Sequence, residues 1–256
     1  MKMEKDIEFA ASLLLRSRYA IGLTGAGISV ESGIRPFRGP GGLWTEFGEP
    51  AMDGYQKFMR DPKTHWEDIM KRRSGNADFA RTIGEAKPNA AHTALAELES
   101  MGVLKFLITQ NIDNLHLAAG SKKVAEIHGN TQKLRCIECN ERYARDAIPL
   151  DVLPPRCPKC QGVVKSDTVM FGEPIPTDVL RICQRESMRA DCMITVGTSA
   201  YVYPAAGFPL EIKRRGGTLV EVNLYESDLT PLCDVSLRGK ATELMAQLVD
   251  CIKASK

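Results

Sequence analysis

Short apolar runs that end abruptly in polar or glycine residues are the feature that most restricts the fold of this chain. Such runs cover residues 19–24, 106–109, 191–196 and 219–223, and helical patterns lie between them at 88–101, 177–187 and 203–215. Strand and helix therefore alternate, which predicts an α/β fold with a doubly wound, Rossmann-like parallel sheet. Ligands bind beyond the carboxyl ends of such strands, so the residues that follow each run are candidate site residues.

The stretch 106–116 carries the densest group of such residues. After the buried run come Gln110, Asn111, Asp113 and His116, which no packing argument requires. The sequence Glu126-Ile-His-Gly-Asn130 follows closely. The pattern indicates a binding or catalytic site, although a polar turn that caps a helix over residues 112–119 also fits it.

The run 19–24 leads into Gly25-Ala-Gly-Ile-Ser-Val-Glu-Ser-Gly33. A glycine-rich turn between strand and helix lets backbone N–H groups approach a pyrophosphate. Val30 replaces the third glycine of the dinucleotide fingerprint, which argues against an ordinary NAD dehydrogenase and leaves a purely structural turn open. Residues 34–44 are rich in Pro and Gly and carry Arg35, Phe37, Arg38 and Trp44, so we expect a mobile flap over an anionic cofactor.

Two CxxC pairs, Cys136/Cys139 and Cys157/Cys160, predict a small metal-binding module. Each pair can present two thiolates to a tetrahedral Zn²⁺, and four cysteines leave no position open for a catalytic water. We therefore expect one structural zinc, with redox-active dithiols as the alternative. The predicted domains are a discontinuous Rossmann-like unit (1–36, 87–132 and 166–256), a flexible cofactor loop with a helical module (37–86) and a zinc module (133–165).

The charge and hydropathy of the chain exclude several classes of function. The formal net charge is only +2, which gives no case for direct nucleic-acid binding. No apolar run approaches the ~20 residues of a membrane span, and the first residues show no small-residue cleavage site. We expect a cytoplasmic protein that does not bind membranes.

Together these motifs resemble the sirtuin family of NAD-dependent protein-lysine deacylases, and in particular the bacterial and archaeal type related to the desuccinylase-like class. The resemblance follows the order of the chain and spans nearly all of it. The matching segments are Gly25-Ala-Gly-Ile-Ser29, Glu31-Ser-Gly33, Phe37-Arg-Gly39, Thr109-Gln-Asn-Ile-Asp-Asn-Leu-His116, His128-Gly-Asn130, the CxxC pairs, Val169-Met-Phe-Gly-Glu173, Gly197-Thr-Ser199 and Val222-Asn-Leu224.

The resemblance implies a role for each matching position, with NAD as co-substrate and an acetylated lysine-containing protein or peptide as partner. The implied catalytic residues are His128, Asn111 and Asp113. The implied cofactor-binding residues are Gly25, Ala26, Gly27, Ser29, Phe37, Arg38, Gln110, Asn111, Ile112, Asp113, Gly197, Thr198, Ser199, Asn223, Leu224 and Ala241. The implied substrate-binding residues are Val169, Met170, Phe171, Gly172 and Glu173, with Arg72 as a further candidate.

His128 matches the general base of the family. A ribose hydroxyl that attacks the activated acyl group needs a base with a pKa near ambient pH, which histidine meets unshifted. A buried histidine satisfied by hydrogen bonds is the alternative for this position. We expect His116 to brace the loop from the following helix, and His65 and His92 to be surface or packing residues.

One departure from the family concerns the acyl group. Sirtuins that prefer succinyl or malonyl groups carry a tyrosine and, three residues on, an arginine that bind the acyl carboxylate. Here Arg72 stands at the arginine position and Ile69 at the tyrosine position, while Arg72 also fits a solvated helix charge. The resemblance thus predicts deacetylation with release of nicotinamide and O-acetyl-ADP-ribose, and weak desuccinylation.

Two other functions stay open from the sequence. An NAD-dependent protein ADP-ribosyltransferase would pass the same activated ribose to another nucleophile. A non-enzymatic protein would sense NAD with the sheet and bind a partner through the zinc module.

Overall fold

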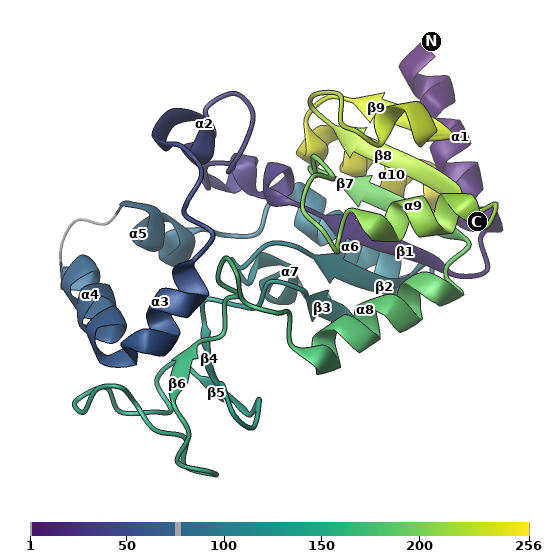
Figure 1. Ribbon diagram of the computed structural model, residues 1–256. Helices are drawn as coiled ribbons and strands as arrows, with labels where there is room; N and C mark the ends of the chain where they lie inside the picture. The colour runs from purple at the N-terminus through teal and green to yellow at the C-terminus, as the bar shows by residue number, and fades with distance from the viewer. Residues whose placement is uncertain (1, 75–77, 256) are drawn as a thin grey trace.

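The computed structural model describes residues 2–74 and 78–255, without the side chains of 72–74 and 78–81. Its larger body is a parallel sheet of six strands in the order β3-β2-β1-β7-β8-β9, with helices on both faces (Figure 1). This confirms the predicted doubly wound fold. The strands are β1 (Ala20–Thr24), β2 (Leu104–Thr109), β3 (Val124–Glu126), β7 (Cys192–Val196), β8 (Thr218–Asn223) and β9 (Val235–Arg238).

The central strands are buried on both faces, as their unbroken apolar character predicts. Every residue of β1 and β7 is buried. One face packs against α1 (Lys2–Arg16), α6 (Ala90–Ser100) and α10 (Ala241–Ala254), and the other against α8 (Thr177–Arg189) and α9 (Gly207–Arg214). In Figure 1 these two helix layers enclose the sheet.

The strand order places the switch in winding direction between β1 and β7. Thr24, at the end of β1, pairs with Thr109 of β2 on one side and with Val196 of β7 on the other. The polar residues after these strands therefore meet at one edge, where ligands bind in folds of this kind. The short 3₁₀ helix η1 (Ala26–Ser32) follows β1 directly at this edge.

A second, smaller body joins the sheet through long insertions, on the left of Figure 1. It contains the antiparallel sheet β5-β4-β6 and the helices between η1 and α6. Trp66 is fully buried there and its Nε1 donates to the carbonyl O of Val164 (2.8 Å), which ties the helices to the small sheet. The elements are α2 (Leu43–Phe47), α3 (Gly54–Arg60), α4 (Pro62–Ser74), α5 (Asp78–Glu85), β4 (Lys133–Cys136), β5 (Arg142–Ala144) and β6 (Val164–Ser166).

The structure differs from the sequence prediction in three places. The helix expected at 203–215 begins only at Gly207. Pro204 disfavours helical geometry at Tyr203, and residues 204–206 form turns before the helix. Strands β3 and β9 were not anticipated, since both are short. The sequence Thr168-Val-Met-Phe-Gly-Glu-Pro174 predicts a short extended segment with a break, whereas in the structure it is a turn with no assigned strand. The remaining elements are α7 (Leu115–Ala118) and η2 (Thr230–Leu232). The domain bounds 1–36, 87–132 and 166–256, 37–86, and 133–165 stay a prediction.

Candidate active site

Side chains from three strand ends are joined by hydrogen bonds at the carboxyl edge of the large sheet. The Gln110 Nε2 atom, after β2, donates to Thr198 Oγ1 (2.8 Å), after β7. Asn223 Nδ2, at the end of β8, donates to the carbonyl O of Thr198 (3.0 Å). The structure thus brings together predicted site residues that lie far apart in the sequence.

Ser29 is the centre of a buried polar group beside this edge. Its hydroxyl donates to Asp113 Oδ2 (2.7 Å) and accepts from Asn111 Nδ2 (3.1 Å). Asn111 Nδ2 also donates to the carbonyl O of Gly25 (3.1 Å). The exposed fraction is only 1% for Ser29, 6% for Asn111 and 7% for Asp113. Buried polar side chains that bond one another in this way are fixed in orientation, as a binding site requires.

His92 extends this group and is the site residue that sequence reasoning missed. Its ring is fully buried, and Nδ1 accepts from the backbone N–H of Asn89 (3.3 Å), the N-cap of α6. Nδ1 also lies 3.0 Å from Asn89 Oδ1, and Nε2 lies 3.4 Å from Ser29 Oγ. Burial lowers the pKa of His92 to about 4, partly opposed by Asp113, so the ring is neutral at pH 7. The spacing from Asn89 to His92, which forms a capping box, was the available signal.

His116 braces the end of β1 from α7, as expected for a residue of the following helix. Its Nε2 lies 2.8 Å from Thr24 Oγ1, which donates in turn to Thr109 Oγ1 (2.8 Å). The ring packs against that of His92, with centroids 4.8 Å apart. Burial lowers the pKa of His116 to about 3, and the neighbouring His92 contributes. The residue therefore acts as a neutral structural contact.

His128, the predicted base, is held by its backbone surroundings. Its Nδ1 lies 3.0 Å from the carbonyl O of Gln110. A carbonyl can only accept, so Nδ1 carries the hydrogen and Nε2 keeps its lone pair. Burial lowers the pKa of His128 below its ordinary 6.5, although the bond to Gln110 opposes the shift. The neutral, proton-accepting form therefore predominates at neutral pH.

Aromatic side chains of the predicted flap contact the predicted substrate segment. The Trp44 ring lies 4.8 Å from that of Phe37 and 5.4 Å from that of Phe171, edge-on, centroid to centroid. The Arg38 guanidinium lies over both Trp44 (4.5 Å) and Tyr201 (4.7 Å), and Tyr201 follows the β7 strand end closely. The flap is thus packed against the segment and against the sheet edge.

The glycines of the turn after β1 have a structural role of their own. A Cβ atom on Gly25 or Gly27 would lie 2.8 or 2.7 Å from the backbone of Gly197. Gly27 N–H donates to Gly197 O (2.8 Å), so the two turns are in direct contact. The structural explanation left open for this motif therefore accounts for both glycines, independently of any cofactor.

The remaining predicted residues have varied surroundings. Val169 N–H donates to the carbonyl O of His128 (2.8 Å), and Glu173 is buried in the turn that follows. Leu224 is exposed after β8, and Ala241 begins α10, just past Gly239, whose N–H donates to Asn223 O (3.2 Å). The side chain of Arg72 lies outside the described residues. The other predicted site residues lie in η1 or in the turns that follow strands: Ala26, Ile112, Met170, Gly172 and Ser199.

The four predicted zinc ligands lie together at the small sheet. Their Sγ atoms are all within 4.8 Å of one another. Cys136 Sγ lies 3.5 Å from Cys160 Sγ, and Cys139 Sγ lies 3.7 Å from Cys157 Sγ. Tetrahedral Zn–S bonds of about 2.3 Å place sulfur atoms about 3.8 Å apart, so the group fits a zinc ion. With four cysteine ligands such an ion is structural.

The comparisons with known proteins agree with this architecture. A model of the Sir2 family matches residues 25–204, which is most of the chain. The chain belongs to the Sir2 family. The match contains the glycine turn, the group around Ser29, His128, the four cysteines and the strand end at Thr198.

Relatives and solved structures of the Sir2 family cover nearly the whole chain. An NAD-dependent protein deacylase of Thermococcus kodakarensis is 46% identical over 95% of either chain. NAD-dependent protein deacylase 1 of Archaeoglobus fulgidus is 45% identical over 92% of this chain and 94% of its own. A Sir2 homologue in complex with NAD has a TM-score of 0.81 at 43% identity, covering 97% of this chain and 94% of its own. A Sir2 protein with a p53 peptide and NAD has a TM-score of 0.77 at 37% identity, covering 95 and 96%.

Proposed function

We propose that this protein is an NAD-dependent protein-lysine deacetylase that transfers the acetyl group to ADP-ribose and releases nicotinamide. The observation that carries the proposal is the convergence of Ser29, Asn111, Asp113 and a neutral, oriented His128 at the switch point of the sheet. The names of the Thermococcus and Archaeoglobus relatives support the same reaction.

NAD supplies an activated glycosidic bond whose cleavage makes the ribose carbon able to accept the acyl oxygen. Asn111 and Asp113 bind the nicotinamide and ribose part in this proposal, with Gln110 and Ile112 beside them. Their buried hydrogen bonds hold donors and acceptors in place before the substrate arrives, which lowers the barrier without reorganisation. The adenosine half is assigned to residues at or after the ends of β7, β8 and β9: Gly197, Thr198, Ser199, Asn223, Leu224 and Ala241. The flap, with Phe37 and Arg38, is proposed to close over the phosphates.

Nε2 of His128 is the atom proposed to take up the proton of the reacting ribose hydroxyl. The bond from Nδ1 to Gln110 O fixes the ring and the tautomer. The lowered pKa keeps Nε2 unprotonated at neutral pH, which a general base requires.

The substrate is proposed to be an acetylated lysine in an extended peptide that binds along residues 169–173. A peptide of this kind gains affinity through backbone hydrogen bonds. The rings of Phe37, Trp44 and Phe171 offer an apolar passage for the lysine stem and its uncharged acetyl group.

We infer that acetyl is preferred to succinyl. Ile69 stands where a tyrosine would bind an acyl carboxylate, and it packs against the apolar core around Trp66. An aliphatic side chain gives no hydrogen bond to a carboxylate, so Arg72 alone would remain for that task.

The cellular location of the enzyme is proposed from its helices and its net charge. No helix among the described residues is long and apolar enough to cross a membrane. The formal net charge of only +2 gives no case for nucleic-acid binding. We propose a cytoplasmic enzyme that acts on acetylated proteins.

Mass spectrometry of the products tests this proposal. The protein is incubated with an acetyl-lysine peptide, with and without NAD. A deacetylase yields the free peptide together with nicotinamide and O-acetyl-ADP-ribose, and only when NAD is present. A gain of mass on the peptide or on another protein would indicate ADP-ribosyl transfer instead, and binding of NAD without any product would indicate a sensor.

A further inference from the structure

The turn at residues 169–173 is held by buried charges that the small sheet contributes. We propose that Lys165 and Arg135 are positioning residues for the acyl-lysine substrate, because their ionic contacts with Glu173 set the conformation of this turn. The inference rests on the proposed function in one respect, the assignment of residues 169–173 to the substrate.

Lys165, on β6, is a fully buried lysine whose donors are all used. Its side chain is 0% exposed, and Nζ donates to the carbonyl O atoms of Ser166 (2.9 Å) and Thr168 (2.7 Å). The third partner is Glu173 Oε2, at 3.0 Å. The ammonium group thus connects the backbone just before the turn to the last residue of the turn.

Glu173 closes the turn upon itself. Its side chain is 2% exposed, and Oε2 accepts from the backbone N–H of Met170 (2.8 Å). The backbone N–H of Glu173 donates to Met170 O (3.0 Å), so both ends of the turn are bonded twice. The other carboxylate oxygen, Oε1, pairs with Arg135 Nη2. Gly172 makes the turn possible with a φ of +78°.

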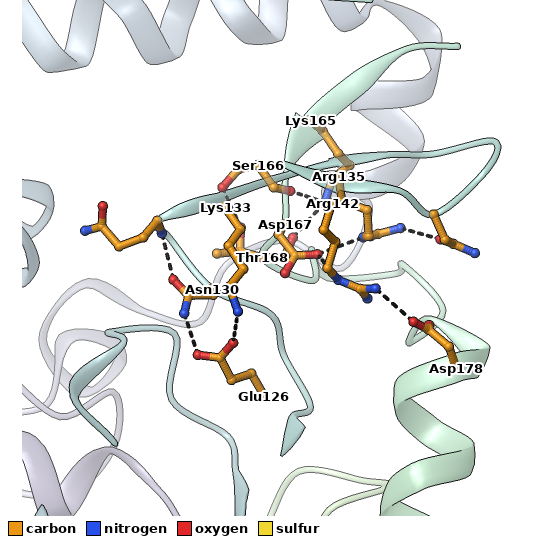
Figure 2. Close-up of polar contacts among 12 residues, drawn as sticks. Glu126, Asn130, Lys133, Arg135, Arg142, Lys165, Ser166, Asp167, Thr168 and Asp178 are labelled. Atoms are coloured by element: carbon orange, nitrogen blue, oxygen red, sulfur yellow. Dashed lines mark hydrogen bonds and ion pairs between the residues drawn. The ribbon is translucent and has the colours of Figure 1, made fainter. Parts of the chain in front are cut away.

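Arg135 connects Glu173 to further ion pairs on both sides of the turn. Its Nε lies 3.1 Å from Asp167 Oδ1, which also accepts from Arg142 Nε (3.1 Å). Arg142 Nη1 then donates to Asp178 Oδ2 (2.8 Å), in the first turn of α8. Figure 2 shows Arg135 and Arg142 meeting at Asp167, and Arg142 reaching Asp178. Residues before and after the turn are therefore tied to the small sheet.

The turn also contacts His128, the proposed base, through its backbone. Val169 N–H donates to the carbonyl O of His128 (2.8 Å). A Cβ on Gly129 would lie 2.0 Å from the carbonyl O of Asp167, so the two backbones touch. A shift of the turn would therefore change its position relative to His128, and misplacement of about 1 Å can cost about a hundredfold in rate.

Buried ion pairs contribute little net stability, because desolvation offsets their attraction, and apolar residues can replace them. Their value here is geometric, since charge-assisted hydrogen bonds from two cations specify one position for Glu173. Arg135 directly precedes Cys136, so the folding of the zinc module also places this cation. The zinc module in this way determines the shape of the substrate turn without taking part in the reaction.

The test separates positioning from stability with three variants: Lys165→Met, Glu173→Gln and the double variant Lys165→Met/Glu173→Gln. Either single change leaves a buried charge short of its partner, so we expect a clear fall in Tm. The double variant removes Lys165 and the carboxylate together, and Arg135 keeps Asp167 (3.1 Å) as a partner, so its Tm should recover part of that loss. Lys253→Met is the control, since it removes an exposed ion pair with Glu97 (2.7 Å) that lies away from the small module.

Two measurements on the double variant decide the inference. Hydrogen exchange followed by mass spectrometry should show faster exchange over residues 168–174, with protection of β4 retained. The Kd of a fluorescein-labelled acetyl-lysine peptide, measured by anisotropy without NAD, should rise about tenfold, as loss of a charge-assisted hydrogen bond predicts. The Kd of NAD for the double variant and both readouts of Lys253→Met should stay at the wild-type values.

Each contrary result has a distinct meaning. Unchanged exchange over 168–174 overturns the inference, whatever the activity, because the charges then do not set the turn. Faster exchange with an unchanged peptide Kd also overturns it, because the turn then does not position the substrate. An absence of NAD-dependent turnover by wild type counts against the proposed function, while exchange and peptide binding still decide the inference.

Discussion

The Nδ1 atom of His128 lies 3.0 Å from the carbonyl O of Gln110, so the residue that ends the β2 run orients the proposed base. Burial lowers the pKa of His128 below 6.5. A general base acts only when unprotonated, so activity is lost as the pH falls through this lowered pKa. We therefore expect kcat/KM to fall to half its plateau only at a pH below 6.5. Half-loss of activity above pH 6.5, in a protein that remains folded by circular dichroism, would contradict this assignment.

The hydroxyl of Ser29 is expected to matter for the use of NAD. Ser29→Ala removes the donor to Asp113 and the acceptor for Asn111 and leaves two buried polar groups without this partner. Loss of such bonds predicts a fall in kcat/KM for NAD of about tenfold or more. Ser12→Ala is the control, because its hydroxyl bonds only locally to Phe9 O on the exposed side of α1. Equal kinetics for the two variants would exclude a role of Ser29 in the site.

Zinc is expected to support the small sheet and its contact with Trp66. In a Trp44→Phe background Trp66 is the sole remaining tryptophan of the two. Its ring is buried against residues of the cysteine module, so Cys139→Ser or a strong chelator should expose it and shift its emission to the red. Elemental analysis should give one zinc per chain, and Cys251→Ser should keep the metal. Retention of zinc and unshifted emission in Cys139→Ser would argue against the Cys₄ site.

Acyl selectivity should follow from the aliphatic residue at position 69. With Ile69 packed into the core around Trp66, a succinyl carboxylate lacks the hydroxyl that would bind it. We expect kcat/KM for an acetyl-lysine peptide to exceed that for the succinyl peptide by about tenfold or more. The comparison is made on one peptide sequence, with Arg72→Met as the second enzyme. The expectation fails if succinyl turnover equals acetyl turnover and Arg72→Met changes neither.

Much of the fold could be predicted because its strands are continuous apolar runs. The turn at Gly25 and the polar residues after β2 and β7 were located from the same pattern, and the four cysteines from their spacing. Such strands can be recognised in the sequence because a strand buried on both faces needs an apolar residue at nearly every position.

Other parts depend on contacts between distant residues, which local signals do not give. The spacing from Asn89 to His92 indicates a helix cap, but only the fold places the His92 ring beside Ser29, from another element. Lys165 reads as an exposed strand residue, yet it is buried because Glu173 and two carbonyl groups replace its water. The turn at 169–173 was missed for a related reason, since the bond from Met170 N–H to Glu173 Oε2 that helps to close it has no counterpart in the apolar pattern of the segment.

The most direct test of the proposed reaction compares wild type, His128→Ala and His65→Ala on an acetyl-lysine peptide with saturating NAD. His65 lies against Phe58 in the helical module and serves as the matched histidine control. Loss of a general base predicts that His128→Ala lowers the NAD-dependent release of acetyl by about a hundredfold to ten-thousandfold. His65→Ala should keep wild-type activity. NAD-dependent deacetylation by His128→Ala at the wild-type rate would contradict the account.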